Sequence, residues 1–395
     1  MPQNAFRVAA VLAALTVAST GRAQQAVTLG EAFALDSKVM AEARRVVVWT
    51  PPGYDTGRRR VPVLYVTDAQ AQFAHTVTTV EFLARNGRIP PMLVVGIFNT
   101  DRTRDLTPYQ DGTPDNDKRL PTAGGADRFL QFFETELIPW VEGRYRTEPY
   151  RVFAGHSFGG LFAVHALAAR PGLFNATIAV SPTLAWRQGE PSKRMEQMLL
   201  RNRELKAALY LTLGEEGDEM QSGFDRMKAV LDRHAGKALR WHMVSMRDED
   251  HGSIVLRSHY DGLEKIFDGW RLPLGGPDAF TGGMAEVDAH YARLSERLGW
   301  TITPPEATVN FLGYGALGRG KVEDALQLFR ANVRNYPESP NVYDSLGEGL
   351  EAAGKLREAL TQYEEAVKRG EAAADPLLDA FREHRDAARK KIDGR

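Results

Sequence analysis

Residues 155–159 read Gly-His-Ser-Phe-Gly, which is the G-x-S-x-G pattern of a serine nucleophile. They follow the apolar run 150–154 and precede the apolar run 161–169, so we expect a strand, a sharp turn and a helix. The two glycines let backbone segments approach closely in such a turn, which lifts Ser157 clear of the sheet. The N–H of Phe158 would then point to where an oxyanion forms. The pattern therefore predicts that Ser157 is a nucleophile.

A serine nucleophile needs a base, and the base needs an orienting acid. In strand–turn–helix hydrolases of this type the order along the chain is Ser, acid, His. We predict that His251 is the base, because it lies in a loop just after the late apolar run 240–246. The acid is expected in the loop 214–219, where four carboxylates compete and spacing does not choose among them. The rival histidines lie within expected helices or strands: His165, His234, His242 and His259.

Short apolar runs alternate with helical patterns through the middle of the chain. Such runs suit strands that are buried on both faces, and their alternation with helices predicts an α/β fold with a mostly parallel sheet. Active sites in these sheets lie at the carboxyl ends of the strands. Helices are expected near 128–141 and 224–231, and strands at 46–49, 61–66, 92–98, 150–154, 176–180, 208–213 and 240–246.

Composition excludes several classes of protein. The 395 residues include 50 basic and 51 acidic side chains, for a net charge of -1, so no basic face for nucleic acid is expected. There is no cysteine, which rules out disulfides, thiolate metal sites and a cysteine nucleophile.

The amino terminus has the three parts of a secretory signal peptide. A short segment ending in Arg7 is followed by the apolar run 8–17 and by small and polar residues at 19–23. We predict cleavage after Ala23 and a secreted or periplasmic protein. The apolar run is too short to cross a bilayer, and no other stretch approaches that length, so no membrane span is expected.

The stretch from Arg44 to Trp270 resembles the putative-esterase family of α/β-hydrolases. The matching pieces include RRVVVWTPPGY, VPVLYVTDAQAQF, RVFAGHSFGGLFAVHAL, LTLGEEGDEM and DEDHGS. This family contains enterobactin-type siderophore esterases, feruloyl and acetyl-xylan esterases, S-formylglutathione hydrolase and mycolyltransferases. The resemblance implies an α/β-hydrolase fold and a serine esterase that requires no cofactor.

The resemblance also implies roles for residues that spacing leaves open. It points to Glu216 as the triad acid, with Asp218 as the runner-up. The family's usual Asp-Gly after the first core strand is Asp68-Ala69 here. The second oxyanion N–H, beside that of Phe158, would therefore come from Ala69 or Gln70.

Three further side chains are candidate contacts for the substrate. His156 occupies the variable position of the nucleophile motif, Trp186 follows the strand end at 180, and Arg104 lies in a charged loop. Most charges of that loop are expected to be structural. The acidic run 248–250 is expected to be solvated and to favour a protonated His251, so no metal site is predicted.

The carboxyl-terminal part repeats itself with an offset of 34 residues. Leu312, Gly313, Gly320, Lys321, Ala325, Leu326 and Phe329 recur as Leu346, Gly347, Gly354, Lys355, Ala359, Leu360 and Tyr363. This period and pattern resemble tetratricopeptide repeats, which are paired helices that bind protein partners. Two repeats are too few for a stable array, so flanking helices or docking on the hydrolase must cover them. We predict a signal peptide (1–23), an esterase domain (24–272), a linker with a connecting helix (273–304) and tetratricopeptide-like repeats (305–391).

The sequence thus predicts a secreted serine esterase with an all-α extension, acting on a small-molecule ester such as a siderophore or carbohydrate ester. Two alternatives stay open at this point. One is an acyltransferase of the same fold, and the other is a non-catalytic binding or scaffold protein that uses the repeats.

Overall fold

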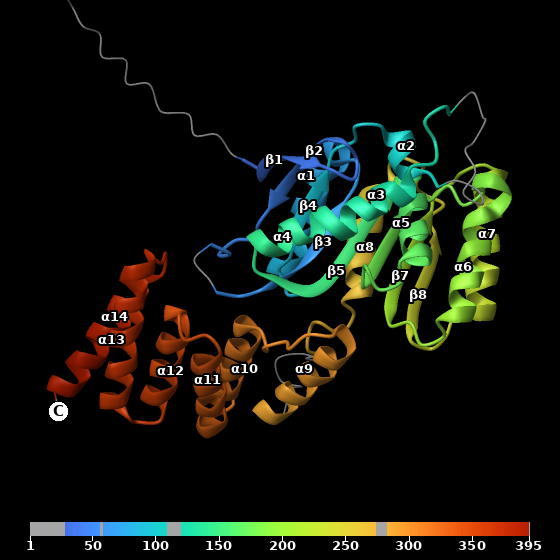
Figure 1. The fold of residues 1–395 in the computed structure, drawn as a ribbon. Coiled ribbons are helices and arrows are strands. Elements are labelled where there is room, and N and C mark those ends of the chain that lie inside the picture. The colour runs from blue at the N-terminus through green and yellow to red at the C-terminus, as the bar shows by residue number, and fades with distance from the viewer. Residues whose placement is uncertain (1–27, 56–57, 109–119, 274–282, 395) are drawn as a thin grey trace, which may run out of the picture.

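An eight-stranded sheet forms the centre of the amino-terminal part of the molecule (Figure 1). The computed structural model describes residues 28–55, 58–108, 120–273 and 283–394. The strand order is β1-β2-β4-β3-β5-β6-β7-β8; β1 and β2 are antiparallel to their neighbours, and the other strands run parallel. The strands are β1 (Glu31–Ser37), β2 (Glu42–Trp49), β3 (Val61–Val66), β4 (Leu93–Ile97), β5 (Thr147–His156), β6 (Ala176–Val180), β7 (Ala207–Leu213) and β8 (Leu239–Ser245).

Helices cover both faces of this sheet, which is the α/β-hydrolase arrangement that the sequence predicts. Strands β3, β4, β6 and β7 are buried at every residue, as expected for apolar strands between two layers of helices. Helices α1 (Ala69–Arg85) and α8 (Ile254–Ile266) pack on one face. The other face carries α3 (Ala126–Phe132), α4 (Ile138–Arg144), α5 (Phe158–Ala169), α6 (Trp186–Arg201) and α7 (Asp218–His234).

The helix expected near 128–141 is interrupted. A π-helical segment, η1 (Phe133–Leu137), lies between α3 and α4, and Pro139 follows it at the start of α4. Because proline donates no backbone hydrogen bond, the regular ladder is broken at this point. Phe133 is nevertheless fully buried against Phe153 and Phe162, so the segment still closes the core.

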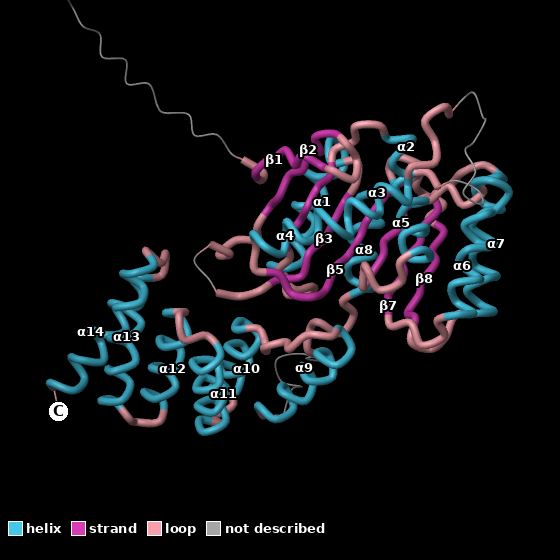
Figure 2. Tube along the Cα trace, in the orientation of Figure 1, coloured by secondary structure: helices cyan, strands magenta, loops and turns pink. Residues whose placement is uncertain are grey.

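Helices joined by loops make up the described residues of the carboxyl-terminal part, 283–394, as Figure 2 shows. Its helices are α9 (Met284–Leu298), α10 (Glu306–Gly318), α11 (Val322–Asn335), α12 (Pro340–Ala352), α13 (Leu356–Ala373) and α14 (Leu378–Asp393). Helices α10 and α11 pair, as do α12 and α13. A Cβ atom at Gly313 would collide with the Phe329 ring, and one at Gly347 with the Tyr363 ring. The same small-against-aromatic contact thus recurs 34 residues later, while the tetratricopeptide assignment stays a prediction.

This helical extension packs on the hydrolase through a shared apolar core. Val287 and Tyr291 of α9 belong to the same buried cluster as Val152 of β5 and Phe267 after α8. The Tyr150 ring lies 5.0 Å from the ring of Trp300, centre to centre. The flanking helix and docking therefore supply burial that two repeats lack.

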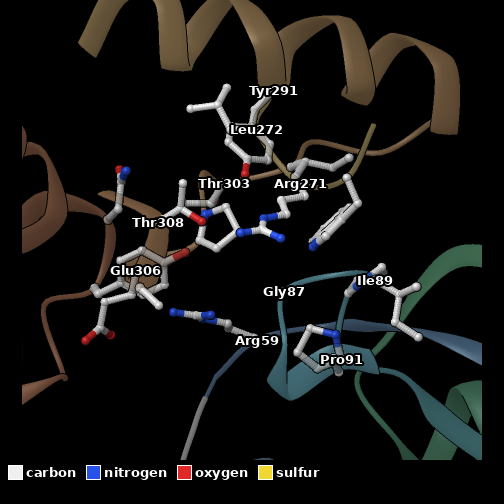
Figure 3. A pocket seen from close by; sticks show the side chains of 18 of the residues that line it. Arg59, Gly87, Ile89, Pro91, Arg271, Leu272, Tyr291, Thr303, Glu306 and Thr308 are labelled. Carbon is white, nitrogen blue, oxygen red and sulfur yellow. The ribbon is translucent and has the colours of Figure 1, made fainter. Parts of the chain in front are cut away.

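A cleft of about 1330 Å³ lies beside this contact, between the amino ends of the parallel strands and α9–α10 (Figure 3). Arg59 and Arg271 extend into it from opposite walls, and Tyr291 and Glu306 also line it. Within the described residues no helix is long and apolar enough to span a bilayer. The predicted signal peptide, residues 1–23, lies outside the described residues.

Candidate active site

Ser157 occupies a strained turn between β5 and α5. Its backbone angles are φ 59° and ψ −114°, a conformation that L-residues rarely adopt and that costs on the order of 1–3 kcal/mol. Its N–H donates to the carbonyl of Val180 at the end of β6, at 2.9 Å. A Cβ atom at Gly155 would overlap the Gly159 carbonyl, so this turn requires glycine. The motif thus forms the sharp strand–turn–helix that presents a serine at the carboxyl edge of a sheet.

His251 and Glu216 meet at the same edge. Glu216 follows β7, and its Oε2 lies 2.6 Å from Nδ1 of His251, which follows β8. The Glu216 side chain is only 8% exposed, whereas that of His251 is 45% exposed. With Nδ1–H donating to the carboxylate, the Nε2 lone pair is free to accept a proton. This is the base–acid geometry of a Ser-His-acid triad.

Backbone hydrogen bonds hold the two loops together. The N–H of Glu215 donates to the Glu249 carbonyl at 2.7 Å. Gly214 lies so close to this second loop that a Cβ atom there would press on the Glu249 and Asp250 carbonyls. This pairing fixes the position of the loop that carries Glu216 relative to the loop that carries His251.

The acidic run that precedes His251 shapes its own loop. The Asp250 carboxylate accepts hydrogen bonds from the N–H groups of Ser253 and Gly252, each at 2.8 Å, and these bonds lower its pKa. Asp248 pairs with Arg257 at 2.7 Å. These contacts present His251 at the tip of a tight turn.

Within the part of the chain that the structure describes, no hydrogen bond or ion pair joins Asp218 to His251. Asp218 is exposed and is the first residue of α7, where a carboxylate interacts favourably with the helix dipole. The geometry therefore supports Glu216 over Asp218 as the orienting acid.

His156 connects the serine turn to the base. Its Nε2 donates to the backbone carbonyl of His251 at 2.6 Å, and the two imidazole rings lie 4.6 Å apart. Burial is the main cause that lowers the pKa of His156, with a further contribution from His251. A neutral His156 thus braces the loop that carries His251 against the turn of Ser157.

The loop after β3 has a half-buried ionic clamp, formed by Asp68, Asn99 and Arg102, that sequence reasoning missed. Asp68 has a left-handed backbone conformation, φ 57° and ψ 40°, immediately before α1. Its carboxylate accepts from Arg102 Nε at 2.7 Å and from Asn99 Nδ2 at 2.5 Å. Arg102 also donates to the His156 carbonyl at 3.1 Å and lies 5.5 Å from the centre of the Phe158 ring. One guanidinium therefore ties the β3 loop to the serine turn.

The predicted oxyanion donors begin two helices. Phe158 is the first residue of α5, and Ala69 and Gln70 open α1. The first N–H groups of a helix have no acceptor within the helix, so they are available to an anion. A Cβ atom at Gly159 would collide with the Thr67 side chain, so the start of α5 lies against the β3 loop. The geometry keeps both Ala69 and Gln70 as candidates for the second donor.

Arg104 and Trp186, two predicted substrate contacts, differ in what they contact in the structure. Arg104 pairs with Glu42 at 2.5 Å and with Asp105 at 2.7 Å, and Asp105 also binds the buried Arg44. Arg104 is thus committed to a structural ion-pair cluster, and the geometry does not support the predicted substrate contact. Trp186 packs edge-on against Phe158, 5.7 Å between ring centres, which keeps it beside the serine turn as a candidate pocket wall.

The four rival histidines named above lie within helices or strands. His165 of α5 contacts Asp127 at 2.8 Å, and His234 at the end of α7 contacts Glu196 at 2.9 Å. His242 lies within β8. His259 is buried in α8, where burial lowers its pKa to about 3.

These features define an α/β-hydrolase with a serine at a strained strand–turn–helix junction and a His–Glu pair beside it. Residues 37–252, more than half of the chain, match the family model described as "Putative esterase", and the chain belongs to that family. It is accordingly a carboxylic ester hydrolase by family.

Among similar sequences are three esterases, two of which are named as siderophore esterases. The ferri-bacillibactin esterase BesA of Bacillus subtilis is 34% identical over 154 residues, which are 34% of this chain and half of that protein. The siderophore enterobactin esterase of Emericella nidulans is 26% identical over 259 residues, covering 53% of this chain and 82% of that one. The siderophore triacetylfusarinine C esterase of Aspergillus fumigatus is 33% identical over 152 residues, covering 33% of this chain and 47% of that one.

Solved structures share the fold. An IroE-like serine hydrolase from Shewanella oneidensis is 26% identical, with a TM-score of 0.68 over 77% of this chain and 99% of its own. An uncharacterised protein from Capnocytophaga ochracea is 18% identical, with a TM-score of 0.62 over 91% of this chain and 99% of its own. The second likeness concerns the fold alone.

Proposed function

We propose that Ser157, His251 and Glu216 form the catalytic triad of a serine esterase that hydrolyses siderophore esters. The observation that carries the proposal is the 2.6 Å contact between His251 Nδ1 and Glu216 Oε2, which lies beside the strained Ser157 turn. His156, which precedes the serine, contacts the backbone of His251 and so links the two parts.

The proposed reaction follows the usual acyl-enzyme sequence. Ser157 Oγ attacks the ester carbonyl carbon while His251 Nε2 takes the hydroxyl proton, and Glu216 stabilises the imidazolium. The N–H of Phe158 and that of Ala69 or Gln70 donate to the oxyanion. The imidazolium then protonates the departing alkoxide, which leaves Ser157 acylated. Water then attacks the acyl group while His251 takes its proton, the bond from the acyl carbon to Ser157 Oγ breaks, and the imidazolium returns the proton to Oγ.

Siderophore esters are the proposed substrate class because two related sequences are siderophore esterases by name and a third is a ferri-bacillibactin esterase. A panel of enterobactin, feruloyl, acetyl-xylan and nitrophenyl esters tests this choice. We expect the highest kcat/KM for enterobactin. A higher kcat/KM for the feruloyl or acetyl-xylan ester would overturn the substrate class while leaving the esterase assignment intact.

Covalent labelling tests the nucleophile directly. A fluorophosphonate should label the protein at one equivalent per chain, and Ser157→Ala should abolish labelling together with turnover. Ser222→Ala, an exposed serine on α7, is the matched control and should label like the wild type. Labelling that persists in Ser157→Ala would show that the nucleophile is another residue.

Export and partner binding are further parts of the proposal. The layout of residues 1–23 supports secretion or a periplasmic location, with cleavage after Ala23. The 34-residue period supports tetratricopeptide-like pairs in the extension that offer a surface to a protein partner. Amino-terminal sequencing of the exported protein would test the cleavage site.

A further inference from the structure

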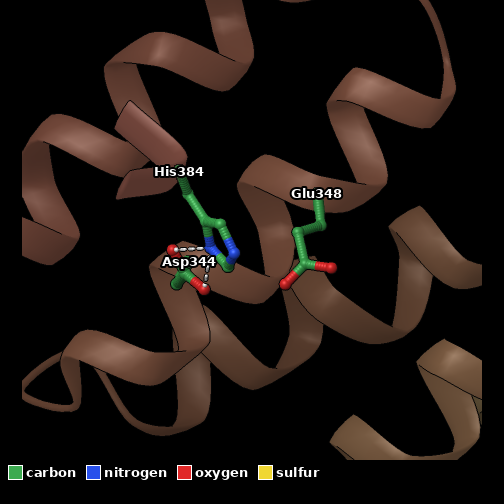
Figure 4. Close-up of side chains that lie close together, drawn as sticks. All are labelled: Asp344, Glu348 and His384. Atoms are coloured by element: carbon green, nitrogen blue, oxygen red, sulfur yellow. Dashed lines mark hydrogen bonds and ion pairs between the residues drawn. The ribbon is translucent and has the colours of Figure 1, made fainter. Parts of the chain in front are cut away.

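Three side chains with metal-binding atoms converge in the helical extension, far along the chain from the serine. Asp344 and Glu348 are four residues apart on α12, so they lie on one face of that helix. His384 reaches them from α14 (Figure 4). One potential ligand atom from each lies within 4.8 Å of the others.

The distances suit donors that share one ion. His384 Nδ1 lies 3.0 Å from each carboxylate oxygen of Asp344. Donors about 2.0–2.2 Å from a common metal ion lie roughly 3 Å apart, so this pair is already at that spacing. The His384 ring lies between Asp344 and Glu348, as Figure 4 shows, and one carboxylate oxygen of Glu348 lies within 4.8 Å of a potential ligand atom of each of the other two residues.

The charges of the cluster are poorly balanced without a cation. The Asp344 side chain is only 7% exposed, and its carboxylate faces the His384 imidazole at 3.0 Å. Glu348 adds a second carboxylate, whose Oε1 accepts from the Tyr314 hydroxyl at 2.9 Å. Two carboxylates thus face one imidazole. A divalent ion would neutralise both carboxylates, which an imidazolium alone cannot do.

The donor set selects the class of ion. Calcium and magnesium prefer oxygen ligands alone, whereas imidazole nitrogen with carboxylate oxygen suits Zn²⁺ and other first-row transition ions. Three protein ligands leave at least one position for water. We propose that Asp344, Glu348 and His384 bind one divalent transition-metal ion, for which Zn²⁺ is the natural probe.

Metal binding here would join the last helix to the repeats. His384 belongs to α14, and both carboxylates belong to α12, two helices earlier. An ion between them cross-links the end of the extension, so it stabilises the folded state by an amount that grows with the logarithm of its concentration relative to the dissociation constant.

Zn²⁺ titration of the full, tag-free chain by calorimetry tests the site. We expect one ion per chain and a rise in Tm with Zn²⁺. Glu348→Gln should weaken binding at least tenfold and remove most of the Tm rise. This substitution keeps an oxygen that can accept the Tyr314 hydroxyl, so the metal-free fold should be unchanged. Asp344→Asn should act in the same direction.

Two controls separate this site from others. Glu383→Gln removes an exposed carboxylate next to His384 and should bind Zn²⁺ like the wild type. His251→Ala should also keep the ion, because the proposed site does not include that imidazole. Absent binding, or equal affinity in the wild type, Glu348→Gln and Asp344→Asn, would overturn the proposal and leave an Asp344–His384 ion pair that only fastens α14.

Discussion

The two ends of the central sheet are built in opposite ways. At the carboxyl end, Ser157 and Asp68 have strained backbones, and charged groups such as Glu216 are withdrawn from water. At the amino end, Tyr150 and Trp270 lie in an apolar core that continues into α9 and α10. Strain and desolvated charge are typical of a reactive site, whereas aromatic packing is typical of a structural contact.

This difference teaches that activity and stability should respond to different residues. Substitutions at the carboxyl end should change turnover with little effect on folding. Substitutions at the amino end should change folding with little effect on turnover, because they lie across the sheet from the reacting atoms.

The largest effect is expected at the triad acid. Glu216→Gln should lower kcat by about 10⁴-fold, because an amide does not hold the imidazole in its working tautomer or stabilise the imidazolium. Steady-state kinetics on a nitrophenyl ester measures this change. Asp218→Asn is the matched control and should retain near wild-type turnover. The reverse ranking would place the acid two residues later.

A smaller loss of activity is expected at the ionic clamp. Arg102→Met removes the group that ties Asp68 to the His156 carbonyl, so the oxyanion donors of the two loops lose their alignment. Losing one oxyanion donor costs about 10²–10³-fold, and we expect kcat to fall by about 10²-fold with KM changed far less.

Arg104→Met serves as the control for the clamp. It breaks the pairs with Glu42 and Asp105 and should lower Tm while leaving kcat and KM near wild type. A raised KM in this variant would support the prediction that Arg104 contacts the substrate. An unchanged kcat in Arg102→Met would show that the clamp does not position the donors.

The smallest effect is expected at the amino end of the sheet. Trp300→Ala removes a half-buried ring that packs on Tyr150, and it should lower the free energy of unfolding by about 2 kcal/mol. Chemical denaturation measures this loss, and kcat should remain within about twofold of wild type. Phe311→Ala, an exposed aromatic on α10, should cost less than about 0.5 kcal/mol. A large drop in kcat for Trp300→Ala would mean that the extension shapes the active site.

Buried strands were well predicted from sequence, as was the edge strand β8, which is shifted by one residue from the predicted run 240–246, but the edge strand β1 was not predicted. The runs 61–66 and 176–180 match β3 and β6 residue for residue, because strands buried on both faces are continuously apolar. Strand β1 lies at the sheet edge, where most of its residues are exposed or half-buried, so it has no such run. An edge strand of mixed polarity cannot be told from a loop by hydrophobicity alone.

The candidate site was only partly predictable, because a sequence pattern is local and some contacts of the site join distant segments. Ser157 and His251 stand at recognisable positions of a local pattern, but Arg102 acts through Asp68, 34 residues earlier, and only the folded sheet brings them together. A usable signal existed for the acid. Gly217-Asp218-Glu219 looks like a helix start with acids in its first turn, which assigns Asp218 to the helix and leaves Glu216 in the loop.

The core shared by the hydrolase and the extension also bears on how such a chain can change over generations. Because Tyr150, Trp270 and Tyr291 are buried together, loss of the extension would leave large aromatic surfaces in water. Each apolar residue acquired on the hydrolase side of this contact increases the apolar surface that loss of the extension would expose, and the same holds for the extension side. An appendage attached in this way becomes inherited as an obligatory part of the protein, whether or not it contributes to the chemistry.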